Sequence, residues 1–303
     1  MAISRSQLAK ELEPGLNALF GLEYDRYDSE HAEIFDEESS DRAFEEDVML
    51  SGFSTAPVKS EGGSVNFDDA QETYTARYTH ETIALAFSIT EEAVEDNLYD
   101  RLAGRYTRAL ARSMSQTKQI KAAAVLNNAF TAGASAIGDG VALCSASHPT
   151  INGTQSNVLA VAADLNETSL EQMLIDVAGA KDERGLKVAI RGQKLIIPKE
   201  LQFVAERLLN SNLRPGSADN DVNATKSMGM LPDGAVVNHF LTDTDAFYIK
   251  TDCPNGFKLF QRTPLRTAME GDFDTGNMRY KARERYSFGV SDWRCVFGTP
   301  GAA

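Results

Sequence analysis

The longest helical signal in the chain lies at residues 90–130, which are TEEAVEDNLYDRLAGRYTRALARSMSQTKQIKAAAVLNNAF. Apolar side chains recur there at every fourth position, and the stripe then continues through Ile120, Ala124 and Val125. The regular part of the stripe consists of Val94, Leu98, Leu102, Tyr106, Leu110 and Met114. Acidic residues at its start and basic residues further along suit the dipole of a single helix. The sequence therefore predicts a helix over residues 90–130, with a length of about 60 Å.

A helix of this length can occur in several structural contexts. Its many charges exclude a transmembrane span, which needs about 20 mostly apolar residues. A two-stranded coiled coil is disfavoured, because its apolar steps alternate between three and four residues. A core helix broken near Gly104 stays open as an alternative. We favour a long helix that lies across a sheet and holds together a molecule of extended shape.

The composition predicts a sizeable core and an acidic surface. The chain has 303 residues, 42% of them hydrophobic, and a formal net charge of -14 at pH 7. Such a charge argues against a surface that grips nucleic acid phosphates. The N-terminal sequence shows no secretory signal. We therefore expect the scattered Cys144, Cys253 and Cys295 to be free thiols in a reducing compartment.

An acidic segment follows a short helix that is predicted over residues 4–20 and interrupted at Pro14 and Gly15. Residues 23–47 are rich in Asp and Glu and contain only Arg26 and Arg42 as strong bases. Interspersed aromatic side chains make the segment too apolar for a purely solvated tail. We expect an arm that lies on another surface, such as a second subunit. A charged surface loop of its own domain is the alternative.

Residues 48–89 predict a long two-stranded ribbon. Residues 73–89 alternate with a period of two, up to the start of the helix. The other strand is predicted over residues 48–58, and a polar tip, KSEGGS, occupies residues 59–64. Such a ribbon is marginal alone, because it has no second layer to bury against. We expect Phe53, Tyr74 and Tyr78 to be buried against a neighbouring subunit.

Helices and strands are mixed in the remainder of the chain. Helices are predicted at residues 168–181 and 199–210, and strands at residues 188–198, 235–240, 246–250 and 258–261. Residues 131–157 are rich in small residues and are predicted to form a long irregular connection. This mixture is typical of an α+β domain.

The last strong strand signal lies at residues 278–290. One parity is apolar except for Glu284, and the other parity is cationic. The cationic parity consists of Arg279, Lys281, Arg283 and Arg285. We expect this basic face to contact the acidic arm.

Motifs for catalysis and cofactor binding are lacking in the sequence. We find no nucleophile elbow, no zinc-protease helix motif and no phosphate-binding loop. Cys144 and His148 have the spacing of two metal ligands, but no second pair completes a set of four. We interpret them as a buried thiol beside a turn histidine that Pro149 holds. The sequence predicts no catalytic residue, no metal and no cofactor.

Several segments follow one another in a characteristic order. They are the arm, the ribbon, the helix segments RSMSQTK (112–118) and VLNNAF (125–130), CSASHP (144–149) and the C-terminal DWRCVFGTPGA (292–302). This succession resembles the major capsid proteins of tailed bacteriophages, particularly the phage Mu-like branch. The resemblance implies the Hong Kong 97 phage-type coat fold, with an N-terminal arm, an extended loop, a spine helix, a peripheral domain and an axial domain.

The resemblance also implies how the chain is divided. The arm is expected at residues 1–47 and the extended loop at 48–89. The peripheral domain is expected at 90–165 and 257–303, and the axial domain at 166–256. Subunit contacts are then expected at Phe53, Lys59, Tyr74, Tyr78, Arg279, Lys281, Arg283 and Arg285.

The function implied is structural rather than enzymatic. The chain is expected to assemble into hexamers and pentamers of an icosahedral virion shell around double-stranded DNA, without sequence-specific binding and without a membrane. Assembly is expected in the bacterial cytoplasm, with scaffold, portal and decoration proteins as further partners. The alternatives are an encapsulin-like nanocompartment shell and an α+β enzyme or ligand-binding domain.

Overall fold

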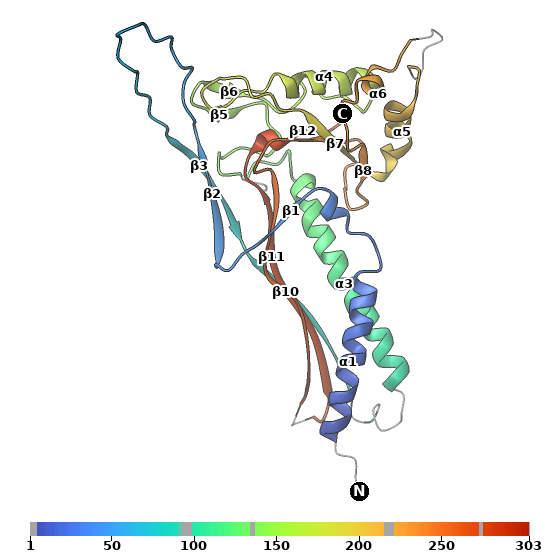
Figure 1. The fold of residues 1–303 in the computed structure, drawn as a ribbon. Coiled ribbons are helices and arrows are strands. Elements are labelled where there is room, and N and C mark those ends of the chain that lie inside the picture. The colour runs from blue at the N-terminus through green and yellow to red at the C-terminus, as the bar shows by residue number, and fades with distance from the viewer. Residues whose placement is uncertain are drawn as a thin grey trace.

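The computed structural model describes residues 5–90, 92, 99–133, 137–214, 221–272 and 275–302. The molecule is elongated, and one loop projects from it at the end opposite the N-terminus (Figure 1). In these described ranges, two four-stranded and two two-stranded sheets are combined with helices. The architecture is therefore of the mixed α+β kind that the sequence predicts.

The long helix, α3 (Tyr99–Asn127), is continuous across Gly104, so the interpretation as a broken helix is wrong. The predicted residues 91 and 93–98 lie outside the described residues. Tyr106 and Ile120 of the predicted stripe are each 49% exposed. Four residues turn a helix about 40° beyond a full turn, so a stripe of such steps winds off the buried face. The buried positions are Ala103, Thr107, Leu110, Ala111, Met114, Lys118, Gln119, Ala122, Ala123 and Leu126.

The N-terminal helix, α1 (Arg5–Tyr24), runs without a break through Pro14, contrary to the predicted interruption. It lies alongside α3 (Figure 1). Leu16 and Phe20 are buried there in one cluster with Tyr280 from the sheet below. This end of the chain is therefore packed into its own body.

The first sheet has the strand order β1-β10-β11-β4 and contacts α1 and α3. Its strands are β1 (Asp36–Ser39), β10 (Phe257–Gly271), β11 (Met278–Val290) and β4 (Glu81–Ile89). The bounds of β11 are those predicted from its alternation. Tyr280, Ala282 and Tyr286 are buried on the apolar parity, which confirms the two-faced strand.

The predicted ribbon is divided between two sheets. β2 (Phe44–Leu50) pairs with β3 (Glu72–Thr79), whereas β4 leaves this ribbon and pairs with β11. His80 lies between β3 and β4, and its ring nitrogens are 3.0 Å from Ser40 Oγ and 3.0 Å from Ser287 Oγ. Residues 51–71 contain no strand, so the predicted strand over 48–58 is wrong beyond Leu50. We call residues 51–71 the projecting loop.

The second sheet has the order β12-β9-β7-β8. It consists of β7 (Gly192–Ile197), β8 (Ala235–Val237), β9 (Phe247–Thr251) and β12 (Val296–Thr299). Around it lie the helices α4 (Glu167–Ala178), α5 (Gln202–Asn210) and α6 (Ala224–Met228). The predicted helices at 168–181 and 199–210 are confirmed by α4 and α5. Because β12 comes from the C-terminal segment, that segment contributes to both large sheets.

Local signals explain where α4 begins. The Asn166 side chain accepts a hydrogen bond from the Ser169 amide (2.9 Å), and the Ser169 hydroxyl accepts one from the Asn166 amide (3.0 Å). This reciprocal capping satisfies two amides at the start of the helix.

Short elements complete the fold. They are the strand pair β5 (His148–Thr150) and β6 (Gly153–Gln155), and the 3-10 turns η1 (Glu30–Glu33), η2 (Lys199–Leu201) and η3 (Trp293–Cys295). Within the described ranges, we find no helix with both the length and the apolar character that a membrane span requires.

Candidate assembly surface

The projecting loop holds large apolar side chains in solvent. Phe53 is 60% exposed, Val58 100% and Phe67 97%. The predicted contact residue Lys59 is also exposed, next to the turn of the loop. The two limbs enclose a hollow of about 410 Å³. Exposed apolar surface gathered in this way is typical of a contact site.

The foot of the loop is fixed to the body by polar contacts. The Arg184 guanidinium lies 3.5 Å from the Asp68 carboxylate and donates to Ser54 Oγ at 3.3 Å. The Ser51 amide donates to the Gln71 carbonyl at 2.8 Å and closes the loop at its base. The sequence analysis missed Arg184, since no pattern around it marks a partner far along the chain. The loop is therefore held at its foot, while its apolar part stays uncovered.

Tyr74 and Tyr78 of β3 are buried in their own chain, so the prediction that they contact a neighbour is wrong. They are 9% and 3% exposed. The Tyr78 hydroxyl lies 2.5 Å from Ser291 Oγ, and its ring packs edge-on against Phe260. Burial raises the pKa of both tyrosines. The alternation of β3 predicted a buried face correctly, but the chain's own core covers that face.

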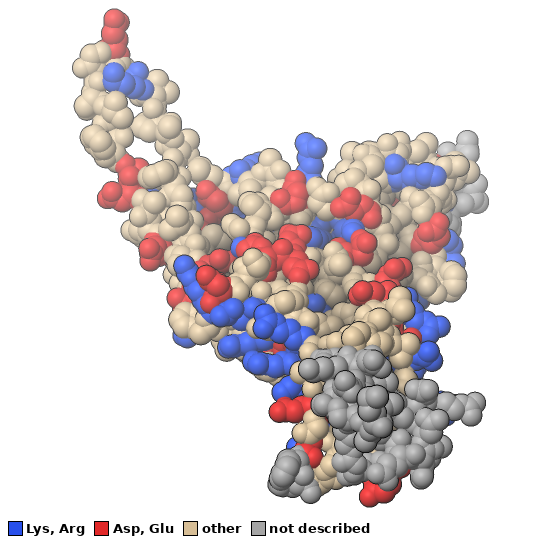
Figure 2. Space-filling model, turned by 60° about the horizontal axis from the view of Figure 1, so that its bottom comes forward, with Lys and Arg blue, Asp and Glu red and all other residues tan. Residues whose placement is uncertain are grey.

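The face of the first sheet that points away from the helices carries a row of cations. Figure 2 shows Lys and Arg side chains gathered on one side of the molecule. We call this set the basic row: Arg266 of β10 with Arg279, Lys281, Arg283 and Arg285 of β11. Arg279 forms an ion pair with Asp272. Arg283 stands directly opposite Arg266, and like charges in that position repel. An acidic partner would relieve this repulsion.

The acidic segment finds its cations elsewhere in its own chain. The ion pairs are Glu23 with Arg112 (3.4 Å), Glu33 with Lys194 (2.5 Å), Asp36 with Lys250 (3.8 Å) and Asp47 with Lys258 (2.8 Å). The Glu30 carboxylate also lies 2.7 Å from His239 Nδ1. The expected pairing with the basic row does not occur among the described residues. The segment is therefore fixed to its own body, as the alternative of a charged surface of its own domain predicts, and its contact with another subunit stays a prediction.

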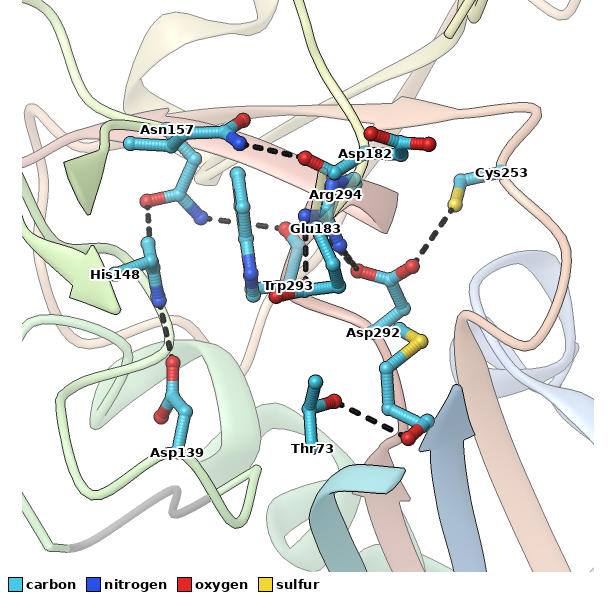
Figure 3. A network of polar contacts seen from close by, with 12 residues as sticks. Thr73, Asp139, His148, Asn157, Asp182, Glu183, Cys253, Asp292, Trp293 and Arg294 are labelled. Atoms are coloured by element: carbon cyan, nitrogen blue, oxygen red, sulfur yellow. Dashed lines mark hydrogen bonds and ion pairs between the residues drawn. The ribbon is translucent and has the colours of Figure 1, made fainter. Parts of the chain in front are cut away.

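A buried polar network joins the connection after α3 to the C-terminal segment (Figure 3). His148 lies 2.6 Å from Asp139 through Nδ1 and 3.0 Å from Asn157 through Nε2. Its ring stacks on Trp293, with 4.4 Å between the centroids. The Asn157 amide group donates to the carbonyl of Val296 at 3.0 Å. The predicted turn histidine thus connects Asp139, Asn157 and Trp293 in the interior.

The thiol predicted to be buried beside this histidine is buried as well. Burial alone raises the pKa of Cys144, so the thiol stays protonated at neutral pH. Among the described residues, no group of three or more His, Cys, Asp or Glu side chains is arranged to hold a metal ion.

Arg294 extends the network on the other side of Trp293 (Figure 3). Its guanidinium is 2.8 Å from Glu183 and 3.2 Å from Asp292. Burial lowers the pKa of Arg294, but the two carboxylates outweigh burial and the pKa is raised. A buried charge with two such partners is compensated, and losing one partner would be costly.

Glu284, the exception on the apolar parity of β11, is fully buried where α1, α3 and β11 meet. Its carboxylate lies 3.9 Å from Lys118 Nζ of α3 and 3.4 Å from the Tyr24 hydroxyl of α1. Burial raises the pKa of Glu284, while Lys118 and then Tyr24 act in the opposite direction. The residue therefore ties the first helix and the spine helix to the sheet.

The described polar groups in the interior serve structural contacts, and the surface offers an apolar loop and a cationic sheet face. This arrangement, on an elongated body, is typical of a structural protein with contact surfaces for other chains. Residues 73–298 match the family described as phage capsid protein, and the chain belongs to this family. It is therefore a structural protein, a phage capsid protein of the virion.

Solved capsid structures share this fold at low identity. The capsid of an empty GTA particle is 12% identical with a TM-score of 0.58, over 91% of this chain and 90% of that chain. The capsid of Myoviridae Phage XM1 is 12% identical with a TM-score of 0.53, over 89% of each chain. A virus-like particle from Pyrococcus furiosus is 9% identical with a TM-score of 0.53, over 94% of this chain and 97% of that chain.

These likenesses establish the fold as the Hong Kong 97 phage type that the sequence predicts. A search among curated proteins found no match.

Proposed function

We propose that the chain assembles into hexamers and pentamers that close around a double-stranded DNA genome, and that it belongs to the phage Mu-like branch. The observation that carries this proposal is the projecting loop, which extends away from its own body with Phe67 97% and Val58 100% exposed. Such side chains gain about 25 cal/mol for each Å² of apolar surface that leaves water. The loop extends away from its own body, so these side chains are covered only if another subunit binds them.

The contacts in this proposal are heterologous, since the loop of one copy lies on a different surface of the next copy. Heterologous contacts that close by rotation give rings, and rings joined at their edges give a shell. Each contact is modest, but several contacts per subunit act together because binding at one raises the effective concentration at the others. Phe53 and Lys59 would contribute from the loop.

The basic row supplies a second contact in this proposal. Lys281 and Arg283 are exposed, and the net charge of -14 gives a neighbouring subunit ample acidic surface to meet them. Interactions between exposed charges weaken as salt rises, because the screening length falls to about 8 Å at physiological ionic strength. This contact should therefore depend on salt.

The proposed division of the chain follows the family layout, with an arm (1–47), an extended loop (48–89), a peripheral domain (90–165 and 257–303) and an axial domain (166–256). A separate hydrophobic cluster around the second sheet supports it, since most of its buried members come from the axial segment. Leu159, Leu165 and Phe297 join them from the peripheral segments. Assembly in the bacterial cytoplasm and scaffold, portal and decoration proteins are further parts of the proposal.

Electron microscopy of the purified protein, combined with size-exclusion chromatography, tests the proposal. The expected result is closed shells, or hexamers and pentamers, that dissociate into subunits at low concentration. Sealed particles of the full chain should also protect packaged DNA from nuclease. A monomer at every concentration and ionic strength would overturn the proposal.

A further inference from the structure

The two limbs of the projecting loop are extended chain without a ladder between them. Residues 52–59 and 64–70 contain no strand. Among these described residues, backbone-to-backbone hydrogen bonds join Ser51 to Gln71 at the base and Ser60 to Gly63 at the turn. Between these points the Ser54 amide donates to the Asp68 carboxylate of the other limb at 2.6 Å. The Asp69 amide donates to the Asp68 carboxylate, and the Asp69 carbonyl accepts from Arg184. The backbone groups open to pairing with another strand are therefore those of residues 64–68.

A second unpaired strand edge lies on the body of the molecule. β4 is the terminal strand of the order β1-β10-β11-β4, so one of its two edges has no strand partner within the described residues. The exposed positions of β4 include Thr82, Ala84, Ala86 and Ser88 on one parity, and Leu85 is 46% exposed on the other. A long edge with exposed apolar side chains is a ready template for strand addition.

The two edges match in their side-chain pattern. In the limb at residues 64–70, Val65 and Phe67 occupy one parity, whereas Ser64, Asn66 and Asp68 occupy the other. Successive side chains of a strand point to opposite faces, and neighbours in adjacent strands share a face. An added limb would therefore extend an apolar row on the helix side and a polar row on the other side. On β4 the apolar row is Ile83, Leu85 and Phe87.

One charge of the limb matches as well. Asp68 is the acid on the polar parity of the limb, whereas Asp69 shares the parity of Phe67. Asp68 pairs with Arg184 in its own chain and would also approach the basic row of the second copy. The basic row lies on the polar side of the sheet, one strand inward from β4, where Ala84 stands beside Arg283. A limb added to β4 would lie about 10 Å from β11, since adjacent strands are about 4.8 Å apart. Small alanines on β4 leave the long arginine side chains free to reach that distance.

We propose that residues 64–68 of one copy add to the free edge of β4 of a second copy as a fifth strand of the first sheet. Val65 and Phe67 then continue the apolar row next to Leu85, and Asp68 lies on the side of the basic row. This inference rests on the proposed shell assembly, and it specifies which segment of a neighbour covers the loop and through which backbone edge.

Disulfide trapping between differently substituted copies tests the contact. Subunits carrying Phe67→Cys are co-assembled with subunits carrying Ile83→Cys, Leu85→Cys or Phe87→Cys, and the shells are mildly oxidised. Adjacent strands bring Cα atoms to about 4.5–5.5 Å, within the range that a disulfide accepts. At least one pair should give a covalent dimer in shells and none in dissociated subunits. The matched controls, Phe67→Cys with Ala84→Cys or Ala86→Cys, present the wrong face and should not crosslink.

Hydrogen exchange on unmodified protein provides a second measurement that does not depend on substitutions. On assembly, amides of residues 64–68 and of β4 should become protected together, at alternating positions. Shells that form while the limb amides exchange as fast as in free subunits would overturn strand addition and leave the shell function standing. Equal crosslinking on both parities would overturn it too. Failure of the unmodified protein to form any shell would instead count against the proposed function itself.

Discussion

Replacing Asn157 by alanine should lower the free energy of unfolding of the subunit by about 2–6 kcal/mol. Asn157 is fully buried, and its Oδ1 accepts from the Ser145 amide (2.8 Å) and lies 3.0 Å from His148 Nε2. Its amide nitrogen faces the Leu143 carbonyl at 2.7 Å, which fixes the orientation of the group. Nε2 of His148 must therefore donate. The alanine variant orphans these two donors, and each unsatisfied buried donor costs about 1–3 kcal/mol.

Thermal unfolding of dissociated subunits, followed by near-ultraviolet circular dichroism, measures this effect. Each kcal/mol shifts the midpoint by about 2–4 °C in domains of 150–250 residues, so Asn157→Ala should melt at least about 4 °C lower than the parent chain. Asn66→Ala is the matched control, because Asn66 is exposed on the projecting loop and should change stability by less than about 0.5 kcal/mol. If the two variants melt together, the reasoning about the network is refuted.

Three further outcomes are expected. Phe20→Ala should lower the free energy of unfolding by about 3–5 kcal/mol in a denaturant titration, because it leaves a cavity between α1, α3 and the sheet. Leu22→Ala, at a position that is 76% exposed, should lower it only slightly. Equal losses in the two variants would contradict the packing of α1. The double variant Lys281→Ala/Arg283→Ala should assemble at lower yield in low salt and approach the parent in high salt, as judged by light scattering; a salt-independent defect would remove the charge contact. Because the pKa of Glu284 is raised in the folded state, its contribution to stability is full below about pH 4.5, its ordinary pKa, and is lost as pH rises through the folded-state pKa. The melting temperature of Glu284→Gln should therefore rise relative to that of the parent chain between pH 4 and pH 7. A difference that stays constant with pH would contradict the burial of this ionisable group.

Elements that carry their own pattern could be predicted from the sequence. β11 alternates between large apolar and cationic side chains over its whole length, so both its bounds and its two faces followed from a period of two. The helices α4 and α5 likewise carry apolar faces on local sequence. The spine helix was predicted as an element, but its buried face was not, because alanine, threonine and even Lys118 fill positions at the interface.

One change of partner left a mark that the sequence analysis overlooked. The apolar parity is even in β3, with Tyr74 and Tyr78, and odd in β4, with Ile83, so the phase of the alternation shifts beside His80, where the chain passes from one sheet to another. Contacts between distant segments leave no such mark, as the contact of Glu30 with His239 shows, which joins residues that are 209 positions apart. A charged segment read alone therefore shows that it needs cations, but not whether they belong to its own body.

Because a single residue, His80, separates β3 from β4, tension on the projecting loop passes directly along β3 into the long ladder between β4 and β11. The pull runs parallel to that ladder, so its hydrogen bonds are loaded in shear and must yield together rather than one after another. In the proposed shell, this joint would therefore resist outward pressure at the point where the loop of one subunit holds its neighbour.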